Sequence, residues 1–368
     1  MKILQLVQKP QLRGAEIFAS QLSNQLQKSD VEVHMISIFT GTSELPFRGK
    51  ITHLQRPLNN RFFDLKAWKM FADLIDQEKP DLIQANAGDT LKFAVLSKII
   101  YRWDVPIVFR NANKMGDFIT TKSKRLLNSF FVKHLEAVIS VSQLCEKDFK
   151  QTFNFPSTKI KTIPIGVEEQ EIPSEPPVDL KDIYSRFRVL VNIGSLVPEK
   201  NHKALINIFD SIAKNDPTVF LIIIGDGRLR AELERKTAAL SSKDRILFAG
   251  YRNDVLQVLK HASAFLMPSL IEGLPGVILE AMYCKTPAVA NNVGGISEVI
   301  TKNTGWLIEK GDTLGFTNAV KEVLEGGEAV ELKIENAHKL VTSEYMNSLI
   351  AARFKEAYEC VISGNSLA

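Results

Sequence analysis

The sequence has few cysteines and no long apolar segment. Its 368 residues include three cysteines, Cys145, Cys284 and Cys360, which lie far apart in the chain. This spacing matches neither a disulfide framework nor a zinc site, and we expect buried thiols. The longest wholly apolar segments, such as VFLIII at 219–224, are far shorter than the roughly 18 residues that a membrane-spanning helix needs. Because the N-terminal residues also lack a signal-peptide pattern, we expect a cytoplasmic protein without a membrane span.

Two common nucleotide-binding motifs are missing as well. No segment completes the G-x-G-x-x-G pattern that marks a dinucleotide site. No glycine-rich segment ends in Gly-Lys-Ser or Gly-Lys-Thr, which disfavours a P-loop nucleotidase. Single glycines do follow strand-like segments, at Gly14, Gly194, Gly225 and Gly227. Each could let the amides of a helix N-terminus approach a phosphate, but such a glycine is more often structural, and both interpretations stay open.

Positive charge is concentrated in residues 1–170, although the whole chain has a formal net charge of only +4. The densest basic cluster is the segment 114–134, KMGDFITTKSKRLLNSFFVKH, in which Lys122, Lys124 and Lys133 alternate with phenylalanines and leucines. One interpretation is a basic amphipathic helix that rests on the anionic inner face of a membrane. The other is an ordinary helix whose charged face is solvated and whose apolar side lies in the core. We expect no nucleic-acid partner.

Short strand-like segments alternate with helical patterns along the chain. KILQLV, VEVHMISIF, DLIQA, PIVF, AVISVS and IKTIPI precede residue 168, and RVLVNIG, VFLIIIG, RILFAG, AFLMP and PAVA follow residue 179. This alternation predicts parallel sheets covered by helices on both faces. The segment 168–179, EEQEIPSEPPVD, has no periodic apolar face and is interpreted as a linker. We therefore expect an α/β protein with two doubly wound, Rossmann-like domains facing each other across a cleft, in which ligands bind at the carboxyl ends of the strands.

Two glutamates flank a short turn in the segment SLIEGLPGVILEAM. Pro275 suits the first turn of a helix, which predicts a helix over 276–283. Glu280 then lies about one and a half turns beyond Pro275, which argues against a proton-sharing pair with Glu272. Amides of the turn could hold a phosphate, and carboxylates accept hydrogen bonds from hydroxyl groups, so a polyhydroxylated ligand linked to phosphate fits the segment. A structural role for both acids stays open.

The arrangement PSLIEGLPGVILEAM, with seven residues between its two acids, resembles the hallmark of retaining glycosyltransferases of the GT-B architecture, specifically glycosyltransferase family 4. The resemblance continues in the same order through GSLVPEKNH, LIIIGDGRLRAELE, ILFAGYRNDV, PAVANNVGGISEVI and TGWLIEKGD. Earlier in the chain, LRGAEIFASQLSNQL, PDLIQAN and IPIGVE are similar to the acceptor domain of that family. The resemblance implies an acceptor-binding domain at 1–170, a donor-binding domain at 171–344 and a C-terminal helix in 345–368 that packs back on the first domain.

The resemblance also assigns roles to particular residues on the donor side. Glu280 would hold the ribose hydroxyls of a nucleotide sugar, and Glu272 would contact its hexose. Lys200 would neutralise the diphosphate as it leaves. The remaining donor-binding residues implied are Gly14, Gly225, Arg252, Gly273, Leu274 and Pro275, with Arg252 near the base and Gly14 approaching from the first domain.

The chain departs from the family pattern in three places. Ser195 replaces an arginine that commonly precedes the lysine, and Arg13 replaces a second glycine beside Gly14, so Arg13 is a candidate for the missing diphosphate contact. The acceptor domain also lacks the histidine that commonly follows the strand PIVF. The candidates for its place are Asn111, Asn113 and Asp117. In the mechanism favoured for the family, the departing phosphate takes the acceptor proton, so a protein base is not required.

The implied activity is transfer of a hexosyl unit, with retention, from a UDP- or GDP-linked sugar to a hydroxyl of a polysaccharide, a lipid-linked glycan or a glycolipid. No Asp-x-Asp metal clamp occurs in the chain, so we expect a metal-independent reaction without a cofactor. Two alternatives stay open. One is a nucleotide-sugar 2-epimerase, and the other is a non-catalytic subunit that binds nucleotide sugars.

Overall fold

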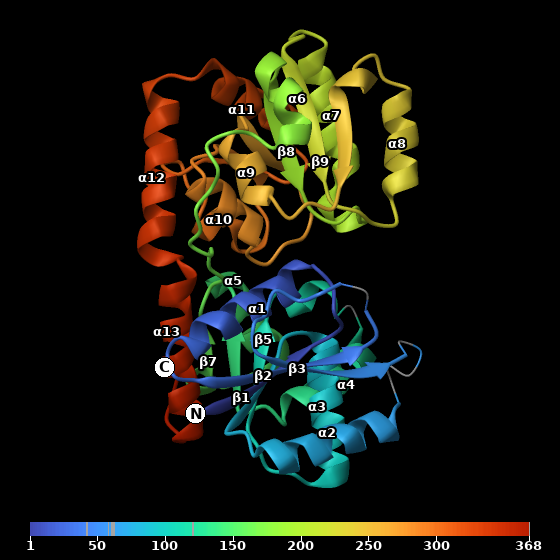
Figure 1. Cartoon of the computed structure of the whole chain (residues 1–368), viewed down its shortest axis with the longest axis vertical. Coiled ribbons are helices and arrows are strands. Elements are labelled where there is room, and N and C mark those ends of the chain that lie inside the picture. The colour runs from blue at the N-terminus through green and yellow to red at the C-terminus, as the bar shows by residue number, and fades with distance from the viewer. Residues whose placement is uncertain (42, 58, 60–62, 120, 368) are drawn as a thin grey trace. The chain divides into compact units, whose positions relative to one another are not determined.

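The chain forms two compact α/β units in the computed structural model, which describes residues 1–41, 43–57, 59, 63–119 and 121–367 (Figure 1). The first unit comprises residues 1–168 together with 347–368, and the second comprises residues 169–346. Each unit is built on its own parallel sheet.

A seven-stranded parallel sheet forms the centre of the first unit, with the strand order β3-β2-β1-β4-β5-β6-β7. Its strands are β1 (Lys2–Val7), β2 (Glu32–Phe39), β3 (Lys50–Arg56), β4 (Leu82–Ala85), β5 (Ile107–Asn111), β6 (Ala137–Ser140) and β7 (Ile160–Thr162). Its helices are α1 (Gly14–Gln27), α2 (Leu65–Glu78), α3 (Gly88–Tyr101), α4 (Lys122–Val132), α5 (Gln143–Phe153) and α13 (Asn347–Ile362). The 3-10 turns η2 (Met115–Asp117) and η3 (Ser157–Lys159) also belong to this unit.

Helices cover both faces of this first sheet. On one face, Trp68 and Phe71 of α2 and Phe93 of α3 pack with apolar side chains of β1, β4 and β5 in a single core cluster. On the other face, α13 packs against α1 (Figure 1). The ring of Phe354 in α13 lies 5.9 Å from that of Phe18 in α1. Burial of apolar area on both faces accounts for the continuous apolar character of the central strands.

The second unit has a six-stranded parallel sheet with the order β10-β9-β8-β11-β12-β13. Its strands are β8 (Arg188–Ile193), β9 (Val219–Ile224), β10 (Ile246–Gly250), β11 (Ala264–Met267), β12 (Ala288–Asn291) and β13 (Trp306–Ile308). Its helices are α6 (Lys181–Arg186), α7 (His202–Ala213), α8 (Arg230–Ala238), α9 (Val255–Lys260), α10 (Gly276–Tyr283), α11 (Thr313–Glu325) and α12 (Glu328–Glu344). Its 3-10 turns are η4 (Val178–Leu180), η5 (Pro198–Lys200), η6 (Lys243–Arg245) and η7 (Gly294–Glu298).

These two sheets confirm the predicted α/β class, and the contact of α13 with α1 confirms the predicted return of the C-terminal helix to the first domain. The predicted helix over 276–283 coincides with α10. Two strands had no counterpart in the sequence analysis, β3 and β13, and both lie at sheet edges. Strand β3, KITHLQR, is largely exposed or half-buried, so it lacks the apolar run by which the central strands were recognised.

The sequence predicted no membrane-spanning helix and three buried cysteines. Among the residues that the structure describes, no helix is both long and apolar enough to cross a bilayer. Cys145 and Cys284 are buried, as expected. Cys360 is only half-buried, contrary to the expectation, because α13 buries one face, including Tyr358 and Val361, and Cys360 lies beside that face.

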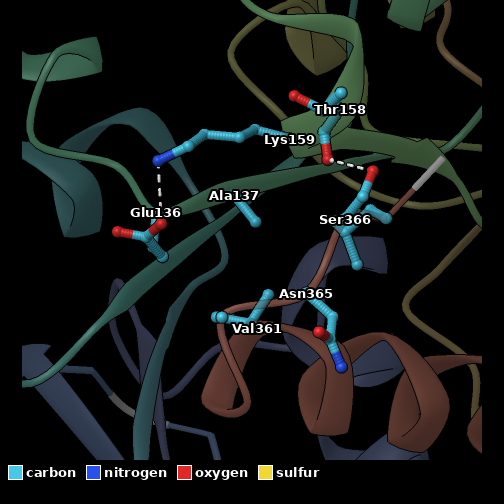
Figure 2. A pocket seen from close by; sticks show the side chains of 9 residues that line it. Glu136, Ala137, Thr158, Lys159, Val361, Asn365 and Ser366 are labelled. Carbon is cyan, nitrogen blue, oxygen red and sulfur yellow. Dashed lines mark hydrogen bonds and ion pairs between the residues drawn. The ribbon is translucent and has the colours of Figure 1, made fainter.

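A pocket of about 260 Å³ lies where the C-terminal residues of the chain meet the amino ends of β6 and β7 (Figure 2). Its walls include Glu136 and Lys159, which form an ion pair of 2.8 Å, and Ser366, whose hydroxyl donates to the carbonyl of Thr158. Ligands of doubly wound sheets bind at the carboxyl ends of the strands. This pocket lies at the opposite edge, and we assign it no functional role.

Candidate functional site

The loops that follow β8 and β9 contact each other through their backbones. Gly225, directly after β9, has a φ of +129°, and a Cβ there would lie 2.1 Å from the carbonyl oxygen of Gly194. The amide of Leu196 donates to the carbonyl of Asp226 at 2.9 Å. Only glycine fits this approach without displacing backbone. Gly225 therefore positions the loop that carries Ser195, whose own side chain is half-buried.

Lys200 lies on that loop, at the end of η5 and just before α7. Its aliphatic stem packs over Gly194, where an added Cβ would meet the Lys200 side chain at 3.6 Å. Its Nζ forms an ion pair of 2.5 Å with Oε1 of Glu272, which is 7% exposed as a residue. The structure thus brings together the two predicted catalytic residues, although 72 positions separate them in the chain.

The loop after β11 holds Glu272, Gly273, Leu274 and Pro275 and is fixed from two sides. The amide of Leu270 donates to the carbonyl of Glu199 at 2.8 Å, which ties this loop to the turn that carries Lys200. From the other side, the amide of Gly295 donates to the carbonyl of Gly273 at 2.5 Å. Pro275 precedes α10 as its N-cap, and no side chain caps that helix start. The first-turn amides of α10 therefore remain available to an anion.

Glu280 lies in α10, one turn beyond the first residue of the helix, and has no hydrogen-bond or ion-pair partner among the described side chains. Burial raises the pKa of its carboxyl to about 7. Glu280 is half-buried, and a carboxyl partly withdrawn from water without a partner commonly marks a functional position. The carboxyl can accept two hydrogen bonds from a diol when it is ionised.

Arg252, predicted near the nucleotide base, is bound by two carboxylates of the same unit. Its Nη1 and Nη2 donate to Asp179 at 2.6 and 2.9 Å, and its Nε and Nη2 donate to Asp254 at 2.8 and 2.6 Å. These bonds raise the pKa of Arg252 and lower that of Asp179. The guanidinium therefore ties η4 to the loop after β10, and a contact with the base remains a prediction.

In the first unit, Gly14 and Arg13 stand at the start of α1. Both are exposed, Arg13 is the N-cap, and its side chain caps no amide of the first turn. A Cβ on Gly14 would meet no atom within 4 Å, so nothing in this unit requires a glycine there. That open space is compatible with the predicted close approach of a ligand.

The three acceptor-side candidates differ in their surroundings. Asn111, at the end of β5, is fully buried and donates from Nδ2 to Ser140 and to the carbonyl of Cys145, both at 3.2 Å. Its Oδ1 has no partner. Asn113 and Asp117 are exposed, and Asp117 lies 3.6 Å from Nζ of Lys114. The structure does not bring these three side chains into one cluster through described hydrogen bonds.

Gly294 is a residue of this region that the sequence analysis did not single out. It has a φ of +57°, and a Cβ there would lie 2.1 Å from the carbonyl oxygen of Glu272. The signal was present in the quoted segment PAVANNVGGISEVI, but a glycine pair alone does not reveal its contact in space. The sequence analysis also did not single out Asn201, whose contact is with a residue distant in the chain. Its Nδ2 donates to the carbonyl of Pro268 at 3.1 Å.

Two family descriptions match the chain, one for each half. Glycosyltransferase Family 4 matches residues 12–171, and Glycosyl transferases group 1 matches residues 180–340. Among curated relatives, the UDP-Gal:alpha-D-GlcNAc-diphosphoundecaprenol alpha-1,3-galactosyltransferase of Escherichia coli is 30% identical over 283 residues, 71% of each chain. The N-acetyl-alpha-D-glucosaminyl L-malate synthase of Bacillus anthracis is 25% identical over 96% of this chain and 95% of its own.

Solved structures show the same fold. HepE of Anabaena, in complex with UDP and glucose, matches with a TM-score of 0.80 at 20% identity, over 98% of this chain and 99% of that one. Sucrose-phosphate synthase of Thermosynechococcus elongatus matches with a TM-score of 0.82 at 18% identity, over 99% of this chain and 100% of that one. The chain therefore belongs to glycosyltransferase family 4, whose members are retaining, nucleotide-sugar-dependent enzymes of the GT-B fold.

Proposed function

We propose that this enzyme transfers a hexosyl unit from a UDP-linked sugar to a hydroxyl of a polysaccharide, a lipid-linked glycan or a glycolipid. The observation that carries the donor side is the cluster of Lys200, Glu272 and the unpartnered Glu280 around the glycine-bearing loops of the second unit. UDP as the nucleotide is supported by the names of the Escherichia coli relative and of the HepE complex. A GDP-linked donor is the alternative, because a relative in Corynebacterium glutamicum is named as GDP-mannose-dependent.

Each donor contact follows from the charge of the group involved. Glu280 accepts hydrogen bonds from the ribose hydroxyls, and Glu272 accepts from hydroxyls of the hexose. The first-turn amides of α10 and the ammonium of Lys200 bind the diphosphate, whose negative charge grows as it leaves. The ion pair with Glu272 holds the Lys200 ammonium beside the loop that precedes α10, and the ammonium exchanges this partner for the diphosphate when the donor binds.

Transfer with retention breaks the bond between the anomeric carbon and the diphosphate oxygen and forms the bond to the acceptor oxygen on the same face. The acceptor hydroxyl gives its proton to an oxygen of the departing phosphate, so charge and atoms balance without a protein base. Lys200 stabilises the charge on that phosphate in place of a metal ion. The reaction is therefore expected to proceed without added metal.

The first unit is proposed to bind the acceptor. Relatives act, by their names, on acceptors that include a diphosphoundecaprenol-linked sugar, a monoacylated phosphatidylinositol mannoside and L-malate. These acceptors differ in size and polarity, and the first two carry lipid. A polysaccharide, lipid-linked glycan or glycolipid acceptor is the class that agrees with most of them.

A surface of α4 supports contact with a membrane. In this helix Leu126 is 76% exposed, Leu127 is 54% exposed and Phe130 is 46% exposed. Part of the apolar side of the segment 114–134 does lie in the core, because Phe131 and Val132 are buried, but these three side chains do not. Residue 120 of the segment lies outside the described residues. Lys122 and Lys124 on the same helix are exposed as well. We define these five exposed side chains as the α4 patch.

The α4 patch combines apolar and cationic groups as peripheral membrane surfaces do. Phosphate headgroups of an anionic bilayer attract lysines, and exposed leucines and phenylalanines gain by entering the acyl boundary. Arg125 also keeps its positive charge, but its guanidinium donates to the carbonyls of Thr152 and Gln151 and is held at the end of α5. We propose that the enzyme rests at the inner face of the membrane on this patch.

A ligand screen by thermal denaturation tests the donor assignment, because a ligand that binds the folded state raises the melting temperature. UDP and UDP-hexoses are expected to stabilise the wild-type enzyme, and GDP is not. Glu280→Ala should lose this response, whereas Glu335→Ala, which removes an exposed carboxylate paired with Lys285, should keep it. Stabilisation by GDP alone would reassign the donor, and no response to any nucleotide would contradict the proposal.

A further inference from the structure

Arg110 is a buried cation of the first unit with no described partner. It is the fourth residue of β5 and only 3% exposed. Its Nε and Nη1 form no hydrogen bond, and among the described residues no ion pair includes it. Its guanidinium stacks instead on the ring of Phe18, 4.3 Å from the ring centroid. Burial lowers its pKa only to about 10, so the group stays charged at neutral pH.

The strand register shows which face of the sheet Arg110 occupies. Val108 pairs with Gln84, and Gln84 pairs with Gln5. Because side chains alternate along a strand, Arg110 shares the face of Val108, Gln84 and Gln5, and this face is covered by α1 and α13. There the hydroxyl of Tyr358 donates to Gln84 at 2.5 Å.

The polar side chains on this face form hydrogen bonds with one another, and none of these bonds includes Arg110. Gln84 donates to Gln5 and to Asn86, at 3.2 and 3.0 Å, and Asn86 donates to Gln5 at 2.9 Å. Tyr358, also close to the guanidinium, has its pKa raised by burial and is neutral. None of these groups supplies the negative charge that a buried guanidinium needs.

Glu16 is the acidic residue whose charge acts on Arg110, but it forms no ion pair with it. Its carboxylate accepts from Nε2 of Gln11 at 2.9 Å, in the first turn of α1. Burial raises the pKa of Glu16. The same turn of α1 begins at Gly14, with no side chain capping its amides.

An unpaired buried charge costs several kcal/mol and is rarely retained without a function. An apolar side chain of similar volume would fit against Phe18 without this cost. Arg110 stacks on the second turn of α1, and the uncapped amides of that helix start lie at the carboxyl edge of the sheet, where ligands of this fold bind.

We propose that Arg110 receives an oxyanion of the acceptor, a phosphate or a carboxylate, together with the first-turn amides of α1. This inference rests on the proposed function, because it specifies the chemical class of the acceptor that the first unit binds. The acceptor then carries a negative group near the hydroxyl that is glycosylated, and neutral sugars are poor acceptors. Arg110 is a binding residue in this account and takes no part in bond breaking.

The test uses inorganic phosphate and malonate as probes of the full-length enzyme. UDP is present at saturation, so that the diphosphate site of the second unit is filled. The expected result is a rise in the melting temperature above that in sodium chloride of equal ionic strength. A response to phosphate alone indicates a phosphorylated acceptor, and a response to malonate alone indicates a carboxylate.

Arg110→Gln should abolish this rise, and Arg110→Lys should keep part of it. The matched control is Arg102→Gln, which removes an exposed arginine at the end of α3 and should respond like the wild type. In chloride, Arg110→Gln should be as stable as the wild type or more stable, because it removes an unpaired buried charge. UDP should raise the melting temperature of all variants as it does that of the wild type. If UDP does not stabilise the wild type, the donor assignment is refuted, and not the role of Arg110.

Three results would overturn the inference. One is the absence of any anion response in the wild type. A second is an undiminished response in Arg110→Gln. The third is a failure of both Arg110 variants to fold, which would assign the guanidinium a structural role.

Discussion

At the scale of single residues, the proposed donor site contains three charged side chains, of which two are paired with each other and one is not. Lys200 and Glu272 neutralise each other at 2.5 Å, whereas Glu280 has no described partner. A paired group needs a partner exchange before it can hold a ligand, but an unpaired buried group gains from any ligand that hydrogen-bonds to it. Glu280 is therefore expected to contribute strongly to binding, and Lys200 chiefly to the rate.

Lys200→Met should lower kcat by about 100- to 1,000-fold, because it removes a positioned charge from the leaving group. Lys203→Met is the control, since Lys203 lies on the first turn of α7, is largely exposed and pairs with Glu232. The measurement is release of nucleoside diphosphate under saturating donor. Turnover like that of the wild type in Lys200→Met would remove this residue from the mechanism.

The affinity for a UDP-sugar should increase as the pH rises from 6 to 8. The pKa of Glu280 is raised to about 7, so its carboxyl is mostly neutral below this value, and ribose hydroxyls bind best to the ionised form. A UDP-sugar is used because its diphosphate does not titrate in this range. Glu280→Gln, which is neutral throughout, should bind weakly and with a flat pH dependence by calorimetry. A wild-type affinity that is flat or falls with pH would contradict this role.

At the scale of secondary-structure elements, the donor region consists of strand-to-helix loops that hold one another through backbone contacts. Gly225 allows the loop of β9 to meet that of β8, and Gly294 allows η7 to meet the loop that carries Glu272. These contacts fix the position of Glu272 relative to Lys200 before any ligand binds. The glycines are thus as important to the site as the charged side chains.

Gly294→Ala should weaken donor binding and lower the melting temperature. Its Cβ would lie 2.1 Å from the carbonyl oxygen of Glu272, so the loop must move. Gly326→Ala is the control, since Gly326 has a φ of +74° but open space around it, and backbone strain alone costs about 1–3 kcal/mol there. Equal losses of donor affinity in the two variants would show that the contact with Glu272 is unimportant.

The α4 patch predicts binding to anionic vesicles. Leu126→Glu combined with Leu127→Glu should reduce cosedimentation with vesicles that contain phosphatidylglycerol, while melting temperature and donor binding stay unchanged, because both side chains are more than half exposed. Leu332→Glu, at an exposed position on α12, is the control. If the double variant binds vesicles as the wild type does, α4 is not the membrane surface.

At the scale of the whole molecule, the alternation of apolar strands with helical patterns was enough to predict two parallel α/β sheets. The edge strands β3 and β13 were not predicted, because β3 is half-exposed and has no continuous apolar run, and β13 is only three residues long. The pairing of Lys200 with Glu272 could not be derived from spacing, since the two residues lie on loops of different strands. The resemblance gave each residue a separate contact with the donor, and only the structure shows the ion pair between them.

The same limit explains why Arg110 was not recognised in the sequence. In the segment PIVFRNAN an arginine near the end of a strand predicts nothing about its partners. Its lack of partners becomes evident only when β1, β4 and α13 are placed around it. Similarly, nothing in the tripeptide Tyr251-Arg252-Asn253 indicates that the guanidinium of Arg252 donates hydrogen bonds to Asp179 and Asp254.

The central claim is that this family 4 enzyme transfers a hexose with retention and without a metal ion. The most direct test is proton NMR of early turnover of α-linked UDP-glucose, UDP-galactose and UDP-N-acetylglucosamine in EDTA, with a panel of anionic and neutral hydroxyl acceptors. The account predicts release of UDP from one of these donors and an α-linked product as the first anomer to appear. A β-linked first product, or turnover that depends on divalent metal, would contradict it.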